Sequence, residues 1–443
     1  MQTPSAIRSL GGIFPGASSS APRVQDTAVI MESKADRGRF LITLAAGIGD
    51  AVVVGLSAID QIVENDPEAS GTIDVLCNPL QSQIFEYDPR LNGIIQTDTL
   101  FFAGPRITEW PRAIILDNEA RWVARFLRER HYEAIFPSIV APGLYWALHA
   151  RMMYPNLVKL GRDLLIRRTP SDVPVYKMVR QIVNRYFRKD IPPSALSDEI
   201  PLYVGIRHIQ QAITVIERLK QASPLREARA QVLLVAADSN SQVTRPPTHL
   251  LAAALAAVLR RYDCLIVCIL PSYTDTTATE NLKNALGSDF AERVFTLPAE
   301  PKPSLLELAA LIDQADLFVT GDTGVMHLAA ATKRVRQASA GPCAPRNSVK
   351  IVALFGGSNP DVWGYQQRTT IVGRGRKEQR TFHPGFVKEL YQSKGKDFFD
   401  HISPQQLAEA IARQVTLRHP PGQLHGTSTS LRDACLQAGT DTR

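Results

Sequence analysis

The chain has 443 residues, a length that fits two domains with terminal tails better than one ordinary core. Hydrophobic residues make up 44% and charged residues 21%, a composition that excludes a disordered or fibrous chain. No apolar run approaches the roughly 20 residues that a membrane-spanning helix needs. Five cysteines without a CxxC pair favour a reducing cytoplasm over a disulfide framework.

The formal charge of +7 is unevenly distributed along the chain. Residues 121–188 carry thirteen Lys or Arg against four Asp or Glu, and residues 366–396 carry eight against two. Such local basicity favours phosphate-bearing partners, such as lipid headgroups, sugar phosphates or nucleic acid. A solvated helix face would produce the same composition.

The first part of the chain reads as a tail followed by βαβ units. Residues 1–37 are rich in Ser, Ala, Gly and Pro without periodicity, which predicts a disordered tail. After it, apolar β-like runs alternate with helical patterns, which is typical of parallel sheets. The expected strands lie at 39–46, 72–77, 93–98 and 132–138, and the first is followed by a helix at 50–64.

A second series of βαβ units follows a connecting segment at 175–230 that reads as helices. Its expected strands lie at 231–237, 264–270, 293–298, 317–321 and 350–356, and its helices at 247–262, 279–286, 304–315 and 324–332. Residues 333–349 read as an insertion in a helix-to-strand step. The pattern predicts an α/β chain with Rossmann-like domains at 38–205 and 206–402, a helix at 403–416 and a disordered tail at 417–443.

The stretch AAGIGDAVV, residues 45–53, lies directly after the first expected strand. Gly47 and Gly49 allow a tight turn close to a ligand, and Asp50 opens the next helix at the edge where α/β sheets bind ligands. A dinucleotide fingerprint needs a third glycine where this chain has Val52. An ordinary helix carboxylate, favoured by the dipole, is the alternative interpretation of Asp50.

The stretch VTGDTGVMHLAAA, residues 319–331, joins a strand to a helix through small and polar groups. Free backbone N–H groups and the dipole at a helix N-terminus favour an anion such as a diphosphate. The alternative is a well-capped helix with a histidine that faces the core. The candidate binding residues are Thr320, Gly321, Asp322, Thr323, Gly324 and His327.

The stretch FGGSNPDVWGY, residues 355–365, follows the last expected strand. Gly356 and Gly357 let backbone approach a ligand, and Ser358, Asn359 and Asp361 offer polar groups. A plain turn before a tryptophan-anchored loop is the alternative.

Together these three motifs resemble glycosyltransferase family 9, the bacterial ADP-heptose:lipopolysaccharide heptosyltransferases and their relatives. The resemblance covers roughly residues 39–415. It implies the GT-B fold, in which two Rossmann-like domains face each other across a cleft. It also implies inverting transfer without a required metal, and no cofactor beyond the nucleotide-diphospho-sugar donor.

The resemblance also implies roles for individual residues. Asp50 matches the proposed general base, and Asp322, Thr323, Gly324 and His327 match the donor diphosphate region. Relatives usually carry a lysine after the first strand of the second domain, where Arg245 is the nearest cation here. Glu280 stands in for a glutamate that binds the ribose, and Pro303 for a methionine beside the adenine. A metal-binding Asp-x-Asp is not matched, because Asp238-Ser239-Asn240 has one carboxylate.

The expected function is therefore that of a cytoplasmic inverting glycosyltransferase. It would move a heptose or hexose from a nucleotide sugar to a cell-envelope saccharide or lipid-linked acceptor, with no nucleic acid as partner. A basic helix at 119–131, with Trp122 and Phe126 on one side, would rest on the anionic inner face of the membrane or guide a phosphorylated acceptor. Packing on the sheet is the alternative. A non-catalytic sugar-nucleotide-binding or scaffold protein and a GT-B nucleotide-sugar epimerase remain as alternatives.

Overall fold

A computed structural model describes twelve stretches of the chain: 39–44, 47–96, 130, 132–137, 173–224, 230–239, 243–271, 276–297, 301–336, 349–365, 367–375 and 397–417. The predicted tail at 1–37 and residues 418–443 lie outside them. The predicted helix at 119–131 also lies outside them, except Arg130. Within the described part, no helix combines the length and apolar character needed to cross a membrane.

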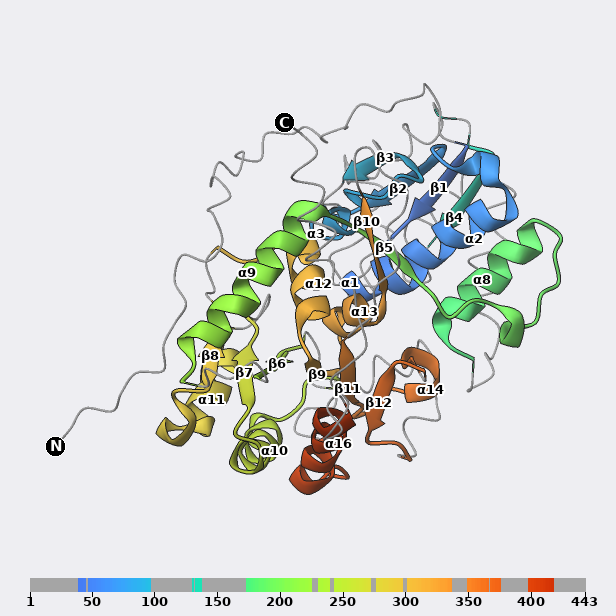
Figure 1. Ribbon diagram of the computed structural model, residues 1–443. Helices are drawn as coiled ribbons and strands as arrows, with labels where there is room; N and C mark the ends of the chain where they lie inside the picture. Colours follow the sequence, from blue (N-terminus) through green and yellow to red (C-terminus); the bar gives the residue numbers. More distant parts are fainter. Residues whose placement is uncertain are drawn as a thin grey trace, which may run out of the picture.

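Four parallel strands form the sheet of the first half of the chain, in the order β3-β2-β1-β4 (Figure 1). The residues of β1 and β2 are all buried, because parallel strands are covered on both faces. The four predicted strands are confirmed, with β3 beginning two residues earlier than expected. Their bounds are Phe40–Thr43 for β1, Ile73–Cys77 for β2, Leu91–Gln96 for β3 and Ala134–Pro137 for β4.

A single run of helix follows β1 and covers the predicted helix at 50–64. It consists of α1 (Ile48–Asp50), the π-helical η1 (Ala51–Leu56) and α2 (Ser57–Asn65). Every residue of η1 is buried. The described connections between β1 and β3 also contain the short helices η2 (Pro67–Ala69), α3 (Pro79–Ser82) and η3 (Gln83–Phe85).

Six parallel strands form the sheet of the second half, in the order β12-β11-β9-β6-β7-β8. Counted from β6, this is the doubly wound order. Strands are first added on one side of β6 and then, from β9 onward, on its other side, so the order switches between β6 and β9. Such sheets bind ligands at the carboxyl ends of those two strands. The bounds are Gln231–Val235 for β6, Leu265–Ile269 for β7, Val294–Thr296 for β8, Leu317–Gly321 for β9, Lys350–Leu354 for β11 and Thr369–Val372 for β12, which the sequence analysis did not predict.

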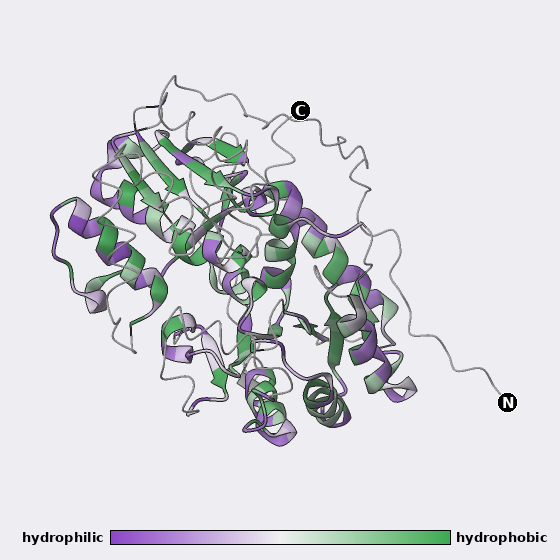
Figure 2. Ribbon diagram, turned by 180° about the vertical axis from the view of Figure 1, so that it is seen from behind, coloured by the Kyte–Doolittle hydropathy of each residue, from purple (hydrophilic) through white to green (hydrophobic). Residues whose placement is uncertain are grey.

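Helices cover the faces of the second sheet, and each predicted helix of this half is present. Seen from behind, the strands are largely hydrophobic, whereas the helices carry polar residues among apolar ones (Figure 2). The bounds are Thr248–Arg261 for α10, Thr276–Leu286 for α11, Ser288–Phe290 for η6, Leu305–Gln314 for α12, Gly324–Ala330 for α13, Pro360–Trp363 for α14 and Pro404–Leu417 for α16.

The connecting segment differs from its all-helical prediction. Between α8 (Val175–Tyr186), the short η5 (Pro193–Ala195) and α9 (Ile206–Ala222) lies a strand, β5 (Pro201–Gly205). It pairs in parallel with β10 (Thr332–Arg336), which occupies the start of the predicted insertion at 333–349. The partner strand is so distant in sequence that no local pattern reveals the pair. The proposed domain boundary at 205/206 falls where β5 ends and α9 begins, and we retain it as a proposal.

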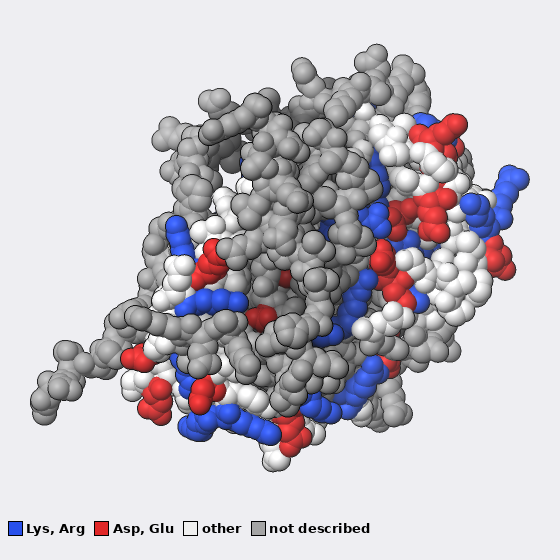
Figure 3. Space-filling view, viewed as in Figure 1, with Lys and Arg blue, Asp and Glu red and all other residues white. Residues whose placement is uncertain are grey.

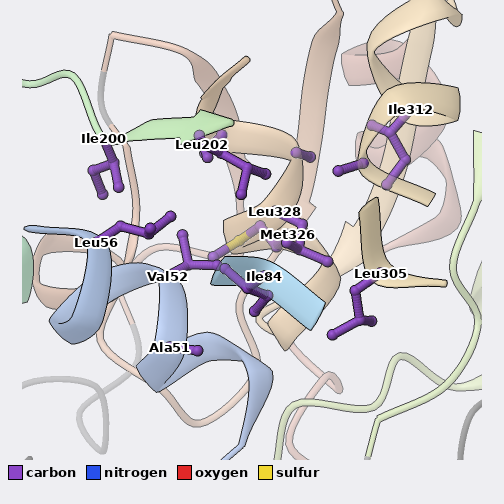
Figure 4. Close-up of a cluster of buried hydrophobic side chains, with 14 of the residues drawn as sticks. Ala51, Val52, Leu56, Ile84, Ile200, Leu202, Leu305, Ile312, Met326 and Leu328 are labelled. Atoms are coloured by element: carbon purple, nitrogen blue, oxygen red, sulfur yellow. The ribbon is translucent and has the colours of Figure 1, made fainter. Parts of the chain in front are cut away.

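One hydrophobic core joins the two halves of the chain. Residues of η1, β5, α12 and α13 meet in it, as Figure 4 shows for Val52, Leu202, Leu305 and Met326. A second core fills the opposite face of the second sheet, between its strands and helices α10 and α16. Because the first core is shared, the turns at the carboxyl ends of β1 and β9 are held in a fixed relation to each other.

Candidate active site

The turn after β1 opens the helix that carries Asp50. Gly47 precedes α1 with an extended backbone (φ −78°, ψ −173°) and is exposed. Its carbonyl oxygen accepts a hydrogen bond from Gln81 Nε2 at 3.1 Å, which ties the turn to α3. Asp50 lies in the first turn of the helix, where the helix dipole favours a carboxylate. The residue is partly exposed, although its Oδ2 is buried.

The turn after β9 carries the second motif. Thr320 is buried, and its Oγ1 lies 3.3 Å from Thr323 Oγ1. Thr323 precedes α13, yet its side chain makes no capping hydrogen bond. The structure therefore does not show the helix capped by its own threonine. A Cβ on Gly321 would collide with the carbonyl oxygen of Thr244, so the loop after β6 lies directly on the end of β9.

The two turns touch each other through their glycines. A Cβ on Gly324 would lie 2.7 Å from Ile48 Cβ and 3.2 Å from the backbone nitrogen of Gly49. A Cβ on Gly49 would lie 2.9 Å from His327 Cδ2. Side chains larger than hydrogen at these two positions would push the helix ends apart. The motifs of the two halves thus lie against each other, and Asp50 follows Gly49 directly in the sequence.

His327 lies buried behind this contact. Its Nδ1 is 2.9 Å from the hydroxyl of Tyr365, and its Nε2 is 3.7 Å from Asp322 Oδ1. The ring of Trp363 packs at 6.2 Å between centroids. The histidine was predicted from the second motif, whereas Tyr365 was quoted in the third motif without a role.

Burial sets the charge of the Asp322 and His327 side chains. It lowers the pKa of His327 to about 3, so the imidazole is neutral near pH 7. Burial also raises the pKa of Asp322 to about 6, although the hydroxyl of Ser358 opposes that shift. At neutral pH the pair is therefore a carboxylate beside an uncharged ring, not an ion pair.

The glycines of the third motif pack against neighbouring loops of the second half of the chain. A Cβ on Gly356 would meet the ring of Phe399 at 2.7 Å, and one on Gly357 would meet Val243 Cγ1 at 2.6 Å. Both glycines are buried, so packing between loops accounts for them. Asn359 Oδ1 accepts a hydrogen bond from Asp361 N at 2.9 Å and thereby opens α14. The residues of this motif that contact Asp322 or His327 are Ser358, Trp363 and Tyr365.

Arg245 and Glu280, the two residues expected to contact the nucleotide, lie in different surroundings. Arg245 lies on the loop that covers the ends of β6 and β9, and its guanidinium donates to the carbonyl oxygen of Ser239 at 2.7 Å. It also pairs with Asp238 at 2.9 Å. Glu280 lies on α11 with a side chain 58% exposed, 3.7 Å from Lys283. Arg245 thus lies at the carboxyl ends of β6 and β9, and Glu280 lies on the helix that follows β7.

A pocket of about 250 Å³ lies beside Tyr365, between the start of α8 and the segment after α14. Its lining includes Tyr176, Lys177, Asp198 and Arg368. No sequence motif contains these residues, because they come from α8, from the segment before β5 and from the segment after α14. Tyr365 therefore has this pocket on one side and His327 on the other.

Comparison with known proteins gives matching results. The family model described as glycosyltransferase family 9 (heptosyltransferase) matches residues 253–391, which include the second and third motifs. A curated relative, lipooligosaccharide heptosyltransferase 2 of Haemophilus influenzae, is 30% identical over 289 residues. That match covers 62% of this chain and 75% of the relative.

Solved structures share the fold at low sequence identity. The structure of the Escherichia coli ADP-heptose lipopolysaccharide heptosyltransferase II has a TM-score of 0.57 at 17% identity, over 86% of this chain and 99% of that one. A glycosyltransferase family 9 protein from Veillonella parvula has a TM-score of 0.59 at 15% identity, over 86% and 98%. The fold is thus GT-B, as the motifs implied. The chain therefore belongs to glycosyltransferase family 9, a family of heptosyltransferases.

Proposed function

We propose that the enzyme transfers a heptose or hexose, with inversion and without a required metal, from a nucleotide-diphospho-sugar to a saccharide or lipid-linked acceptor of the cell envelope. The names of the relatives support this, since one is a lipooligosaccharide heptosyltransferase and another an ADP-heptose lipopolysaccharide heptosyltransferase. Family membership also favours transfer over the scaffold and epimerase alternatives. The observation that carries the proposal is the contact between the turn before Asp50 and the turn of Asp322 and His327.

Asp50 is the proposed general base. An inverting transfer needs a carboxylate that takes the proton of the acceptor hydroxyl as its oxygen attacks the anomeric carbon. Asp50 is partly exposed and adjoins Gly49, which contacts the donor-side turn. The acceptor would approach over Gly47 and Gly49, where Gly47 has no atom within 4 Å of its Cβ position.

The turn after β9 is the proposed site of the donor diphosphate. As the glycosidic bond breaks, negative charge grows on the departing nucleotide diphosphate, and fixed hydrogen-bond donors stabilise it. The neutral His327, the hydroxyls of Thr320 and Thr323 and nearby backbone N–H groups are such donors. The carboxylate of Asp322 would repel a diphosphate, so we assign it to a sugar hydroxyl. Arg245 and Glu280 are the proposed contacts of the nucleotide, and Gly321, Gly324, Gly356 and Gly357 let the loops pack around it.

Replacement of Asp50 tests the division between the two sides. Asp50→Asn should reduce transfer at least about a hundredfold, because a general base contributes about 10²–10⁴ to the rate. Donor binding should change little, because Asp50 lies on the acceptor side. Glu68→Gln, which changes an exposed carboxylate of the same half, is the matched control and should transfer normally. Transfer by Asp50→Asn at the wild-type rate would exclude Asp50 as the base.

The nucleotide can be identified by thermal shift with ADP, UDP, GDP and CDP. A ligand that binds the native state raises the melting temperature with the logarithm of its concentration above Kd. The name of the E. coli structure favours ADP. If none of the four nucleotides stabilises the protein, the donor site as proposed is wrong.

We also propose that the enzyme works at the inner face of the membrane. The excess of Lys and Arg at 121–188 supports attraction to anionic lipids, which is worth about 1 kcal/mol per basic residue near the surface. On the face that Figure 3 shows, the described lysines and arginines lie among aspartates and glutamates rather than in a patch of their own. Sedimentation with vesicles of phosphatidylglycerol at low and high salt tests the proposal, and equal recovery with uncharged vesicles would reject it.

A further inference from the structure

The hydroxyl of Tyr365, a residue for which the sequence predicted no role, contacts the imidazole ring of His327. Tyr365 is 3% exposed, and its hydroxyl lies 2.9 Å from His327 Nδ1. A buried tyrosine hydroxyl needs a hydrogen-bond partner. Among the described residues, His327 is the one that provides it. The two rings are also in edge contact, with centroids 5.7 Å apart.

The surroundings decide which of the two groups donates. Burial lowers the pKa of His327 to about 3 and raises that of Tyr365 well above 10, so both are uncharged near pH 7. If Nδ1 carried the imidazole proton, the lone pair of Nε2 would face the Asp322 carboxylate at 3.7 Å. An N–H group facing that carboxylate is favourable, whereas a lone pair is not. The tyrosine hydroxyl therefore donates to Nδ1.

We propose that Tyr365 is a positioning residue that fixes the rotation and tautomer of His327, so that its Nε2–H faces the donor diphosphate. This rests on the proposed function for the identity of the ligand. The 3.7 Å from Nε2 to Asp322 is longer than a hydrogen bond, so the N–H remains available to a ligand oxygen. Nε2 also lies at the contact of the two turns, 3.5 Å from the Cβ position of Gly49.

Tyr365 is itself held from the opposite side. The ring of Tyr176 on α8 stacks on it, with centroids 5.5 Å apart and planes inclined by 10°. The hydroxyl of Tyr176 donates to Asp198 at 2.6 Å, and Gln367 donates to the same carboxylate at 3.0 Å. Because α8 belongs to the first half of the chain, the orientation of His327 depends on the packing of both halves.

Nitrogen NMR of the free protein, with histidine labelled with ¹⁵N, tests the orientation without any substrate. His327 should show a protonated Nε2 and an unprotonated Nδ1 near pH 7.5. His327→Gln identifies its resonances by their loss. In Tyr365→Phe the anchor is lost, so these resonances should broaden or report a mixture of tautomers. A protonated Nδ1 in the wild-type protein would overturn the proposal, whatever the enzyme transfers.

A double-mutant cycle tests the consequence for the donor. Tyr365→Phe should lower kcat/KM for the donor about tenfold, because one hydrogen bond to a charged ligand loses its geometry. The amide of His327→Gln reaches the place of Nε2 and has no tautomers. Tyr365→Phe added to that variant should therefore change kcat/KM less than twofold, to within about the additivity error of 0.5 kcal/mol. An equal tenfold loss in both backgrounds would show a merely structural role and overturn the proposal.

Tyr132→Phe is the matched control. Its hydroxyl is also buried and donates to a carboxylate, Asp74, at 2.8 Å, in the sheet of the first half. It should leave kcat/KM and the His327 resonances unchanged, and a tenfold loss there would contradict the assignment to Tyr365. Failure of the proposed function would be recognised by a different observation. In that case none of the four nucleotides would bind, while the NMR result for His327 would still stand.

Discussion

Gly49 lies so close to His327 that a Cβ added to the glycine would sit 2.9 Å from the imidazole Cδ2. The two residues belong to motifs in different halves of the chain, 278 positions apart in sequence (327 minus 49). Their contact joins the turn after β1 and the turn after β9, the proposed acceptor and donor sides, into one structural unit. Changes at this contact should therefore affect transfer and stability together.

Gly49→Ala should destabilise the protein and impair transfer. Overpacking of a filled contact typically costs about 1–3 kcal/mol. Denaturation with urea and the transfer rate measure the two effects. Gly47→Ala is the matched control, because Gly47 has open space and φ −78°, which alanine adopts. It should keep or raise stability, so a loss of transfer there would report on the acceptor alone. Wild-type stability of Gly49→Ala would contradict the contact.

Gly324→Ala should have the same effect from the other side, since its Cβ would lie 2.7 Å from Ile48 Cβ. Once one substitution has separated the two helix ends, the second meets less resistance. The double variant with Gly49→Ala should therefore lose less stability than the sum of the single losses, by about 0.5 kcal/mol or more. The free energies of unfolding of the four proteins measure this, and strict additivity would speak against a shared contact.

The pH dependence of stability should reveal the two opposite pKa shifts behind the site. The pKa of Asp322 is raised to about 6, so between its unfolded value and pH 6 the native state binds the extra proton and stability falls with rising pH. The pKa of His327 is lowered to about 3, so between pH 3 and its unfolded value the unfolded state binds the extra proton and stability rises with pH. Over pH 4–6 the two contributions oppose each other.

When either side chain is replaced, the pH dependence of stability should show the contribution of the other one alone. Asp322→Asn should make stability rise more steeply over pH 4–6, by about 1 kcal/mol per pH unit. His327→Gln should shift the slope downward by a similar amount. Urea denaturation at half-unit pH steps provides the slopes. Variants that run parallel to the wild type would show that these carboxyl and imidazole groups titrate normally.

Arg180→Ala should be strongly destabilising. The Arg180 side chain is fully buried in α8 and donates to Asp60 at 2.6 Å and to the carbonyl oxygen of Glu199. Breaking a buried ion pair from one side costs about 3–5 kcal/mol. Arg218→Ala, at an exposed position of α9, should cost less than about 0.5 kcal/mol. Thermal and urea unfolding compare the two, and equal small losses would refute the role of Arg180.

Most elements could be predicted from local sequence because their signals are local. Short continuous apolar runs indicated β1, β6, β7 and β9, within a few residues of their bounds. The helical period of apolar residues indicated α10 and α12 equally well. The turns with Asp50 and with Asp322 and His327 could be located because each follows a buried strand and contains glycine. Strand β5 was missed because its partner β10 lies far along the chain. Strand β12, which pairs with β11 in the other sheet, was not predicted either.

The sequence by itself thus determined the α/β class, the two series of parallel strands and the turns that carry Asp50, Asp322 and His327, because hydrophobic period and glycine placement act over a few residues. The tertiary structure decided the rest. It brought Gly49 against His327, set Tyr365 on Nδ1 and buried Asp322 and His327 deeply enough to move their pKa values in opposite directions. Contact and desolvation depend on groups that meet only after folding, so no local pattern could reveal them.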